Sequence, residues 1–259
     1  MSVHYRSEEG MAVLTLDAPP ANTYSYPLMR ELDEAILRAR FDDAVHAIVL
    51  TGAGDKFFCA GADIRMLQTA EPAFKYHFCL HANETLNRLE QTPKLVVAAL
   101  NGHTVGGGLE IALAADLRVA RKGGGKIGLP EIHLGVLPGT GGTQRLTRLV
   151  GKARALTLML SGRLFSFEEA RDLGIVQEVV EATDFAAAVR DYVRAFLPPT
   201  RASKAVGLIK RAVQTGPELP FQDALALERE LQQQLFQSED AKEGLAANLE
   251  KRAPVFRGK

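Results

Sequence analysis

Short apolar segments alternate with longer stretches of helical spacing through the first half of the chain. The apolar segments are rich in Val, Leu and Ile and are followed by Gly, Pro or Asn, which is typical of buried strands. We expect strands over residues 11–16, 47–51, 95–100 and 117–120, and helices over 28–39, 71–89 and 109–115. This alternation predicts the α/β class, although some strands follow one another directly and the order is not a clean βαβ series.

The second half of the chain has a different pattern. After about Lys152 it is mostly helical, with one brief strand expected over residues 175–180. Pro198-Pro199 interrupts the chain, and helical spacing then continues through Phe221, Leu225, Leu231 and Leu235. We therefore predict a core over residues 1–197 and a helical C-terminal region over residues 198–259.

Composition and charge exclude several classes of protein. The 259 residues include 31 Lys plus Arg and 31 Asp plus Glu, so the net charge is zero, which argues against a nucleic-acid binder with a broadly basic surface. Two cysteines exclude a disulfide-dense scaffold, and the sequence shows neither a zinc motif nor a run of apolar residues long enough to span a membrane. The start lacks a signal-peptide pattern, and we expect a cytoplasmic protein.

Three glycine-rich segments, over residues 59–64, 101–110 and 129–144, are candidates for chemistry. The second lies where a strand turns into a helix. Glycine lets the backbone approach a ligand closely there, and the first N–H groups of a helix point at whatever precedes it. Such a turn can stabilise an oxyanion. Glu110 falls in the first turn, where it either complements the helix dipole or exchanges protons with a ligand.

Glu131 follows Pro130 in the third segment, 21 residues beyond Glu110 (131 − 110). Two convergent carboxyl groups would supply an acid and a base, although sequence spacing alone does not place them on one substrate, and a solvated loop glutamate is the alternative. The chain has no match to GxxxxGK[ST] or GxSxG, and no GxGxxG that is followed by an acidic residue at the spacing of a dinucleotide-binding site. The glycine run Lys122-Gly-Gly-Gly-Lys126 is interpreted as the tip of a hairpin and not as a phosphate cradle.

The glycine-rich segments, taken together with the strand and C-terminal motifs, resemble the crotonase family, the enoyl-CoA hydratase/isomerase superfamily. The similarity covers nearly the whole chain, and the motifs occur in the family's order. It is carried by Ile48-Val-Leu-Thr-Gly52, Ala60-Gly-Ala-Asp63, Asn101-Gly102, Gly106-Gly-Gly108, Pro130-Glu131, Pro138-Gly-Thr-Gly-Gly-Thr-Gln-Arg145 and Glu250-Lys-Arg252. The resemblance implies a crotonase-like spiral of ββα units that carries an acyl-CoA site. It further implies a C-terminal helical region that serves trimerisation and completes part of that site, in a trimer or a dimer of trimers.

The resemblance also implies a reaction and its residues. Backbone N–H groups of Ala62 and Gly107 would hold the thioester oxygen as an enolate forms. Hydratases of the family resemble this chain in carrying glutamates at the positions of both Glu110 and Glu131, whereas typical isomerases keep only the second. We therefore expect reversible hydration of a 2-trans-enoyl-CoA to a 3-hydroxyacyl-CoA, with Glu110 activating water and Glu131 delivering a proton to C2. Gly139 matches a position that helps to place the water.

Coenzyme A is expected as part of the substrate, with no further cofactor and no metal. Contacts with it are implied for Lys56, Ala60, Asp63 and Ile64, and for Lys251 across a subunit interface. The chain departs from common hydratases at residues 22–26 and 67–81, and both departures leave the acyl group open.

Two alternatives remain at this stage. The first is a Δ3-Δ2 enoyl-CoA isomerase or another crotonase reaction through an enolate. The second is a non-catalytic RNA-binding or scaffold member of the fold, against which the zero net charge argues.

Overall fold

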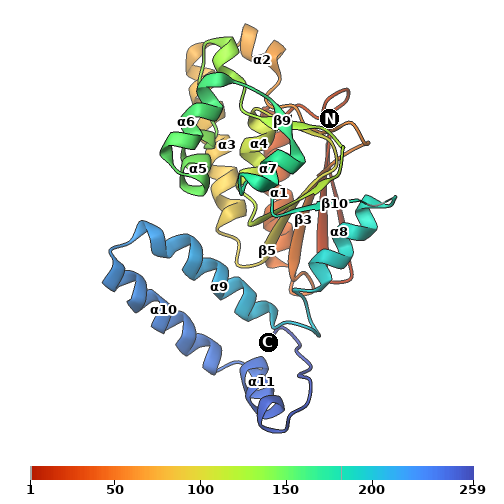
Figure 1. Ribbon diagram of the computed structural model, residues 1–259, viewed down its shortest axis with the longest axis vertical. Coiled ribbons are helices and arrows are strands. Elements are labelled where there is room, and N and C mark those ends of the chain that lie inside the picture. Colours follow the sequence, from red (N-terminus) through yellow and green to blue (C-terminus); the bar gives the residue numbers. More distant parts are fainter. Residues whose placement is uncertain (1, 182) are drawn as a thin grey trace.

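The computed structural model describes residues 2–181 and 183–259. Figure 1 shows an α/β body that contains the N-terminus and, below it, three helices that extend away from the body. This arrangement agrees with the spiral fold and the C-terminal helices that the sequence predicts. In the part of the chain that is described, no helix combines the length and the apolar character needed to cross a bilayer.

The larger sheet has six strands in the order β1-β2-β3-β5-β7-β10. All neighbouring pairs are parallel except β1 and β2, which form an antiparallel pair. The strands are β1 (Ser2–Glu8), β2 (Met11–Asp17), β3 (Ala47–Gly52), β5 (Leu95–Leu100), β7 (Leu117–Arg121) and β10 (Glu178–Val180). Both faces of the central strands are covered, so β5 is buried along its whole length, and this explains its uninterrupted apolar sequence.

The smaller sheet has four strands in the order β4-β6-β8-β9. Its strands are β4 (Phe57–Cys59), β6 (His103–Val105), β8 (Lys126–Gly128) and β9 (Phe165–Ser166). Consecutive strands along the chain enter different sheets: β3 then β4, β5 then β6, β7 then β8. This alternation is the spiral, and it explains why predicted strands follow one another without an intervening helix. It also corrects the hairpin predicted at Lys122–Lys126, because β7 and β8 do not pair and the glycine turn joins the two sheets.

Helices cover the two faces of the larger sheet unequally. The first eight are α1 (Tyr26–Phe41), α2 (Ile64–Thr69), α3 (Pro72–Glu90), α4 (Gly107–Leu113), α5 (Gly142–Val150), α6 (Lys152–Ser161), α7 (Phe167–Asp172) and α8 (Phe185–Arg194), with a 3₁₀ turn η1 (Glu131–Leu134) before α5. Leu14, Leu50 and Val96 point into the main core with α1 and α3, whereas Val49 and Val97 point to the opposite face, under α8. The alternation along each strand follows the two-residue period of a sheet.

The C-terminal helices are α9 (Ser203–Thr215), α10 (Phe221–Phe236) and α11 (Glu239–Leu249), with a 3₁₀ turn η2 (Gly216–Glu218) between the first two. A buried ion pair joins them to the body, since Lys210 Nζ of α9 lies 2.9 Å from Asp116 Oδ2. The chain end returns to the start of α9, where the Phe256 N–H donates to the Pro199 carbonyl at 3.1 Å.

Most predicted elements are confirmed to within two residues. The exceptions are elements whose position depends on contacts with other parts of the fold and not on the local sequence. The strand expected over 175–180 is confined to Glu178–Val180, and the strand Ser2–Glu8 and the short strands β4, β6 and β9 are absent from the predicted set. That N-terminal strand is half exposed and polar, so no apolar run marks it.

Candidate active site

Three loops meet at one edge of the smaller sheet. Strands β4, β6 and β8 are parallel neighbours, so their carboxyl ends lie side by side. Ala62, Gly107 and Glu131 follow these three ends by three, two and three residues respectively (62 − 59, 107 − 105, 131 − 128). The spiral therefore brings together residues that are far apart in the sequence.

The loop between β6 and α4 requires glycine for two separate reasons. Gly106 has φ of +58°, which favours glycine, and its N–H donates to the Gly128 carbonyl at 2.9 Å. A Cβ on Gly108 would clash with the Cys59 carbonyl. The start of α4 is thereby pressed against the end of β4. Among the described residues, the N–H of Gly107 has no acceptor, as expected for the first residue of a helix.

The loop after β4 lies directly against this helix start. Gly61 has φ of +93°, and a Cβ there would stand 3.1 Å from the Gly107 nitrogen. Tyr24 holds the segment on its other side: the Tyr24 N–H donates to the Gly61 carbonyl and the Asp63 N–H donates to the Tyr24 carbonyl, both at 2.9 Å. In an extended segment the intervening amide faces away from such a partner. The Ala62 N–H accordingly finds no acceptor within the described chain.

Glu110 is buried and firmly held. Its carboxylate accepts hydrogen bonds from the N–H of Gly142 at 2.7 Å, from the N–H of Thr140 at 2.8 Å and from the Thr140 hydroxyl. Burial raises the pKa of Glu110, while these hydrogen bonds and the charge of Arg145 act in the opposite direction. Burial outweighs them, so the pKa of Glu110 lies above its usual value, and the three donors limit that rise.

Glu131 has the opposite environment. It lies at the start of η1, and its Oε2 is buried with no hydrogen-bond partner among the described residues. Its Oε1 faces Gly106, because a Cβ built there would stand 3.0 Å away. Burial, together with the negative charge of Glu110, raises the pKa of Glu131 to about 7. Both glutamates border Gly106, because the Glu110 N–H donates to the Gly106 carbonyl at 3.2 Å.

The two glutamates thus form a pair with unlike environments. One is stabilised as an anion by three donors, and the other is favoured as a neutral acid. Pairs of carboxyl groups whose surroundings separate their pKa values are the usual arrangement of a general base beside a general acid. The arrangement can move one proton to a substrate while accepting another from it.

Gly139 directly precedes Thr140, whose N–H donates to Glu110. A Cβ on Gly139 would lie 3.4 Å from Cys79 Sγ of α3, and the Gly139 carbonyl accepts from Asn83 Nδ2 at 3.4 Å. Burial raises the pKa of the Cys79 thiol, and the charge of Glu110 raises it further, so Cys79 also borders the site.

Three further residues support the site and were not singled out from the sequence. They are Tyr24, Thr140 and Arg145. Arg145 reaches Glu90 Oε2 at 2.9 Å and the Thr140 carbonyl at 3.3 Å, and so ties the loop that holds Glu110 to α3. Thr140 and Arg145 lie within a motif that was noted for its glycines alone. The unusual Tyr24 marked a departure from the family pattern, but only the fold shows what it contacts.

Four of the residues expected to bind coenzyme A, Lys56, Ala60, Asp63 and Ile64, lie beside β4 and α2, whereas the fifth, Lys251, follows α11. Lys56 and Ile64 are exposed, with Lys56 directly before β4 and Ile64 at the first position of α2. The Asp63 side chain caps α2 by accepting from the N–H groups of Arg65 and Met66. The main-chain N–H of Ala60 donates to the Ala21 carbonyl at 3.1 Å.

Lys251 is separated from this group within one chain. It follows α11, and Figure 1 places α11 at the opposite end of the molecule from α2. A single copy therefore does not unite the C-terminal lysine with the other four residues expected to contact coenzyme A.

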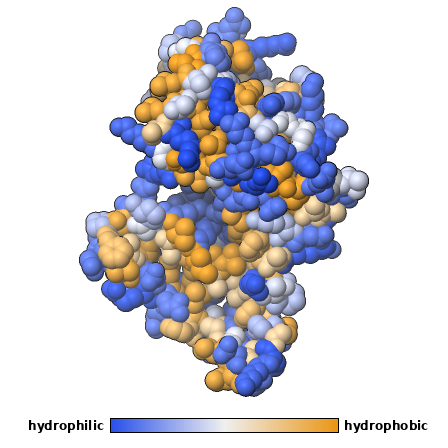
Figure 2. All heavy atoms as spheres, viewed as in Figure 1, coloured by the Kyte–Doolittle hydropathy of each residue, from blue (hydrophilic) through white to orange (hydrophobic). Residues whose placement is uncertain are grey.

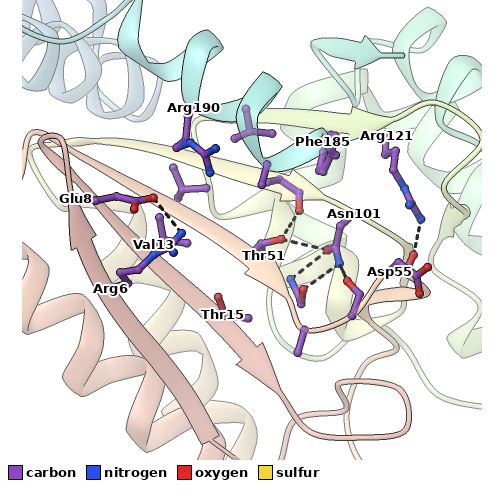
Figure 3. A pocket seen from close by; sticks show the side chains of 17 residues that line it. Arg6, Glu8, Val13, Thr15, Thr51, Asp55, Asn101, Arg121, Phe185 and Arg190 are labelled. Atoms are coloured by element: carbon purple, nitrogen blue, oxygen red, sulfur yellow. Dashed lines mark hydrogen bonds and ion pairs between the residues drawn. The ribbon is translucent and has the colours of Figure 1, made fainter. Parts of the chain in front are cut away.

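A second hollow lies on the other face of the larger sheet. This cavity of about 410 Å³ is lined by β1, β2, β3 and β5 below and α8 above (Figure 3). Most of its polar groups already bond within the protein: Asn101 Nδ2 donates to the Gly52 and Gly54 carbonyls, and Arg6 pairs with Glu8 at 2.9 Å. It holds no pair of convergent acids, and neither Glu110 nor Glu131 lines it. The loop cluster at the smaller sheet is therefore the better candidate for catalysis.

No three His, Cys, Asp or Glu side chains in residues 2–181 and 183–259 come together in a way that could hold a metal ion. The chemistry available at the loop cluster is that of two amides and two carboxyl groups.

The fold and this cluster define an α/β protein in which two amides without an acceptor in the described chain lie near two glutamates with unlike surroundings. Residues 6–259 match the family model described as enoyl-CoA hydratase/isomerase. The short-chain-enoyl-CoA hydratase of Clostridium acetobutylicum is 36% identical over 252 residues, which are 97% of this chain and 95% of that protein. The (E)-benzylidenesuccinyl-CoA hydratase of Thauera aromatica is 36% identical over the full length of both chains.

Among solved structures, the enoyl-CoA hydratase of Geobacillus kaustophilus superimposes with a TM-score of 0.96 at 45% identity, covering 99% of this chain and 97% of that one. The chain belongs to the enoyl-CoA hydratase/isomerase family. This confirms the family and the class of enzyme expected from the motifs.

Proposed function

We propose that the chain catalyses the reversible hydration of a 2-trans-enoyl-CoA to a 3-hydroxyacyl-CoA. The observation that carries the proposal is the contrast between Glu110 and Glu131 beside two unpaired amides. Relatives named as hydratases act on a short enoyl thioester and on an aromatic one, so they support the reaction and leave the acyl group open.

In the proposed mechanism the thioester oxygen lies against the N–H groups of Ala62 and Gly107. As water adds to C3, negative charge moves onto that oxygen, and the two amides stabilise it without reorganising. Glu110 takes a proton from the attacking water, and Glu131 gives its proton to C2. Gly139 would place the water. The reverse reaction exchanges the roles of the two glutamates.

Coenzyme A is proposed to lie outside this pocket, along Lys56, Ala60, Asp63 and Ile64. Lys251 would reach it from a neighbouring subunit, since it lies at the far end of its own chain. The C-terminal helices carry the apolar surface that such an assembly needs, and Figure 2 shows apolar residues over these helices. Their most exposed members include Val213 (67%), Phe221 (73%) and Leu249 (84%). We expect a homotrimer or a dimer of trimers, which sedimentation of the purified protein measures.

The deciding experiment mixes the protein with a short 2-enoyl-CoA and follows the loss of enoyl absorbance together with formation of the 3-hydroxyacyl product. A parallel reaction with a 3-enoyl-CoA tests isomerisation. Hydration supports the proposal. Conversion of the 3-enoyl substrate alone would assign the chain to the isomerases, and RNA binding without turnover of either substrate would assign it to the non-catalytic members.

A further inference from the structure

Tyr24 reaches three parts of the candidate active site, namely the segment around Ala62, Gly107 and, through Thr140, Glu110. Its main chain brackets Ala62 by the two hydrogen bonds to Gly61 and Asp63. These bonds fix the direction of the Ala62 amide, because rotating the peptide would break at least one of them.

The ring of Tyr24 supports the second amide. The side chain is only 2% exposed, and a Cβ built on Gly107 would lie 2.6 Å from Tyr24 Cε1. The ring therefore packs directly behind Gly107. On its other side it meets Phe78 of α3, with ring centroids 5.7 Å apart.

The hydroxyl of Tyr24 reaches the base. It lies 3.2 Å from Thr140 Oγ1, and that hydroxyl in turn bonds Glu110. An ionised carboxylate can only accept, so Thr140 must donate to Glu110, and Tyr24 must then donate to Thr140. Hydrogen bonds arranged in series polarise one another, so the Tyr24 hydroxyl strengthens the bond that Thr140 makes to the carboxylate.

We propose that Tyr24 is a positioning residue that couples the oxyanion amides to the state of Glu110, on the assumption that the proposed hydratase function is correct. An apolar side chain of similar width at this position would fill the space behind Gly107 but could not supply the hydroxyl. The ring and the main chain are then structural supports, and the hydroxyl is the group that acts on catalysis through Thr140.

The test compares Tyr24→Phe, Thr140→Val, Thr140→Ser and the double variant Tyr24→Phe/Thr140→Val in hydration of a short 2-enoyl-CoA. Tyr24→Phe keeps the ring and the main chain, so its melting temperature and KM should stay close to those of the parent protein. We expect kcat to fall about three- to tenfold, the range for one net hydrogen bond, and the acidic limb of the kcat profile to move to higher pH. Tyr192→Phe, which removes a half-buried hydroxyl on α8, is the matched control.

Three further results belong to the same proposal. Thr140→Ser should retain most of the activity, whereas Thr140→Val should lose at least as much as Tyr24→Phe. The double variant should be no slower than Thr140→Val alone, because both changes interrupt one chain of bonds. Replacement of Tyr24 by 3-fluorotyrosine, a stronger donor, should move the acidic limb to lower pH.

Unchanged kcat and an unchanged acidic limb in Tyr24→Phe, or losses that multiply fully in the double variant, would overturn the role of Tyr24. That failure is distinct from failure of the hydratase proposal, which would show as no hydration of a 2-enoyl-CoA by the parent protein.

Discussion

The Gly142 N–H donates to Glu110 Oε1 at 2.7 Å, so the carboxylate of the proposed base is held by main chain as well as by a side chain. A main-chain donor cannot be removed by an ordinary substitution, and it keeps its direction when nearby side chains move. Glu131 has no comparable donor on Oε2. This difference suits Glu110 to the role of base and Glu131 to that of acid in the proposed reaction.

Replacement of either carboxyl group by an amide should slow hydration. We expect Glu110→Gln and Glu131→Gln each to lower kcat/KM for a short 2-enoyl-CoA by at least about tenfold, since acid–base groups typically supply about 10²–10⁴ in rate. Glu34→Gln on α1, where the side chain is 71% exposed, is the control and should behave like the parent protein. Steady-state kinetics measure the effect, and parental rates in both active-site variants would contradict the mechanism.

The pH dependence of kcat/KM should be bell-shaped, with the basic limb near pH 7. Catalysis requires one proton on the glutamate pair, and the pKa of Glu131 is raised to about 7, so activity should fall about tenfold per pH unit above that value. Hydration neither takes up nor releases a proton overall. The dehydration of a 3-hydroxyacyl-CoA must therefore show the same limb, and two different limbs would contradict a shared proton.

The same raised pKa affects folding. Because the folded protein holds the Glu131 proton more tightly than the unfolded chain, whose carboxyl has the ordinary pKa of 4.5, this residue makes the free energy of unfolding fall as pH rises from about 4.5 to about 7. Glu131→Gln should lessen that fall. Chemical denaturation of both proteins at several pH values measures the free energy of unfolding. If its dependence on pH were the same in both proteins, the pKa of Glu131 would not be raised by folding.

Bulk at Gly107 should disable the oxyanion site. A Cβ there would overlap the Tyr24 ring and hydroxyl, so Gly107→Ala must displace either the amide or Tyr24. We expect kcat/KM to fall about 10²- to 10³-fold, the usual cost of losing one oxyanion donor, together with a lower melting temperature. Gly216→Ala is the control, since a Cβ there meets only Ala224 at 3.9 Å.

The buried pair of Lys210 and Asp116 should hold the C-terminal helices to the body. Their side chains are 6% and 12% exposed, and Lys210 Nζ also donates to the Lys94 carbonyl at 3.0 Å. Lys210→Met leaves Asp116 buried without its partner, so the free energy of unfolding should fall by about 3–5 kcal/mol. The double variant Lys210→Met/Asp116→Asn should recover part of that loss. A double variant less stable than Lys210→Met would contradict the pairing.

The sequence was sufficient to predict the central strands of the larger sheet and helices α1, α3 and α4, because these elements bury continuous or periodic apolar faces. The strands of the smaller sheet have only two or three residues each and carry no such pattern. Strand Leu95–Leu100 is predicted to the residue, since both of its faces lie in the core. No local pattern in the sequence shows whether two successive strands enter the same sheet or different sheets. For this reason the turn at Lys122–Lys126 was predicted wrongly as a hairpin.

The residues of the candidate site could likewise be predicted only in part from the sequence. The glycines, Glu110 and Glu131 could be named from motifs, whereas the contacts of Tyr24 and Thr140 depend on segments 116 residues apart. Their pairing is set by the fold and not by any pattern near either residue.

The alignment of three strand ends also bears on how such a chain can vary. Ala62, Gly107 and Glu131 each follow a short strand of the smaller sheet, so their mutual geometry is set by three neighbouring ladders. Extra residues inserted at the remote end of a spiral turn would leave those ladders in place. One residue deleted within β6 would shift Gly107 relative to both neighbours. Length variation among relatives should consequently be tolerated far from this edge and rejected within a few residues of it.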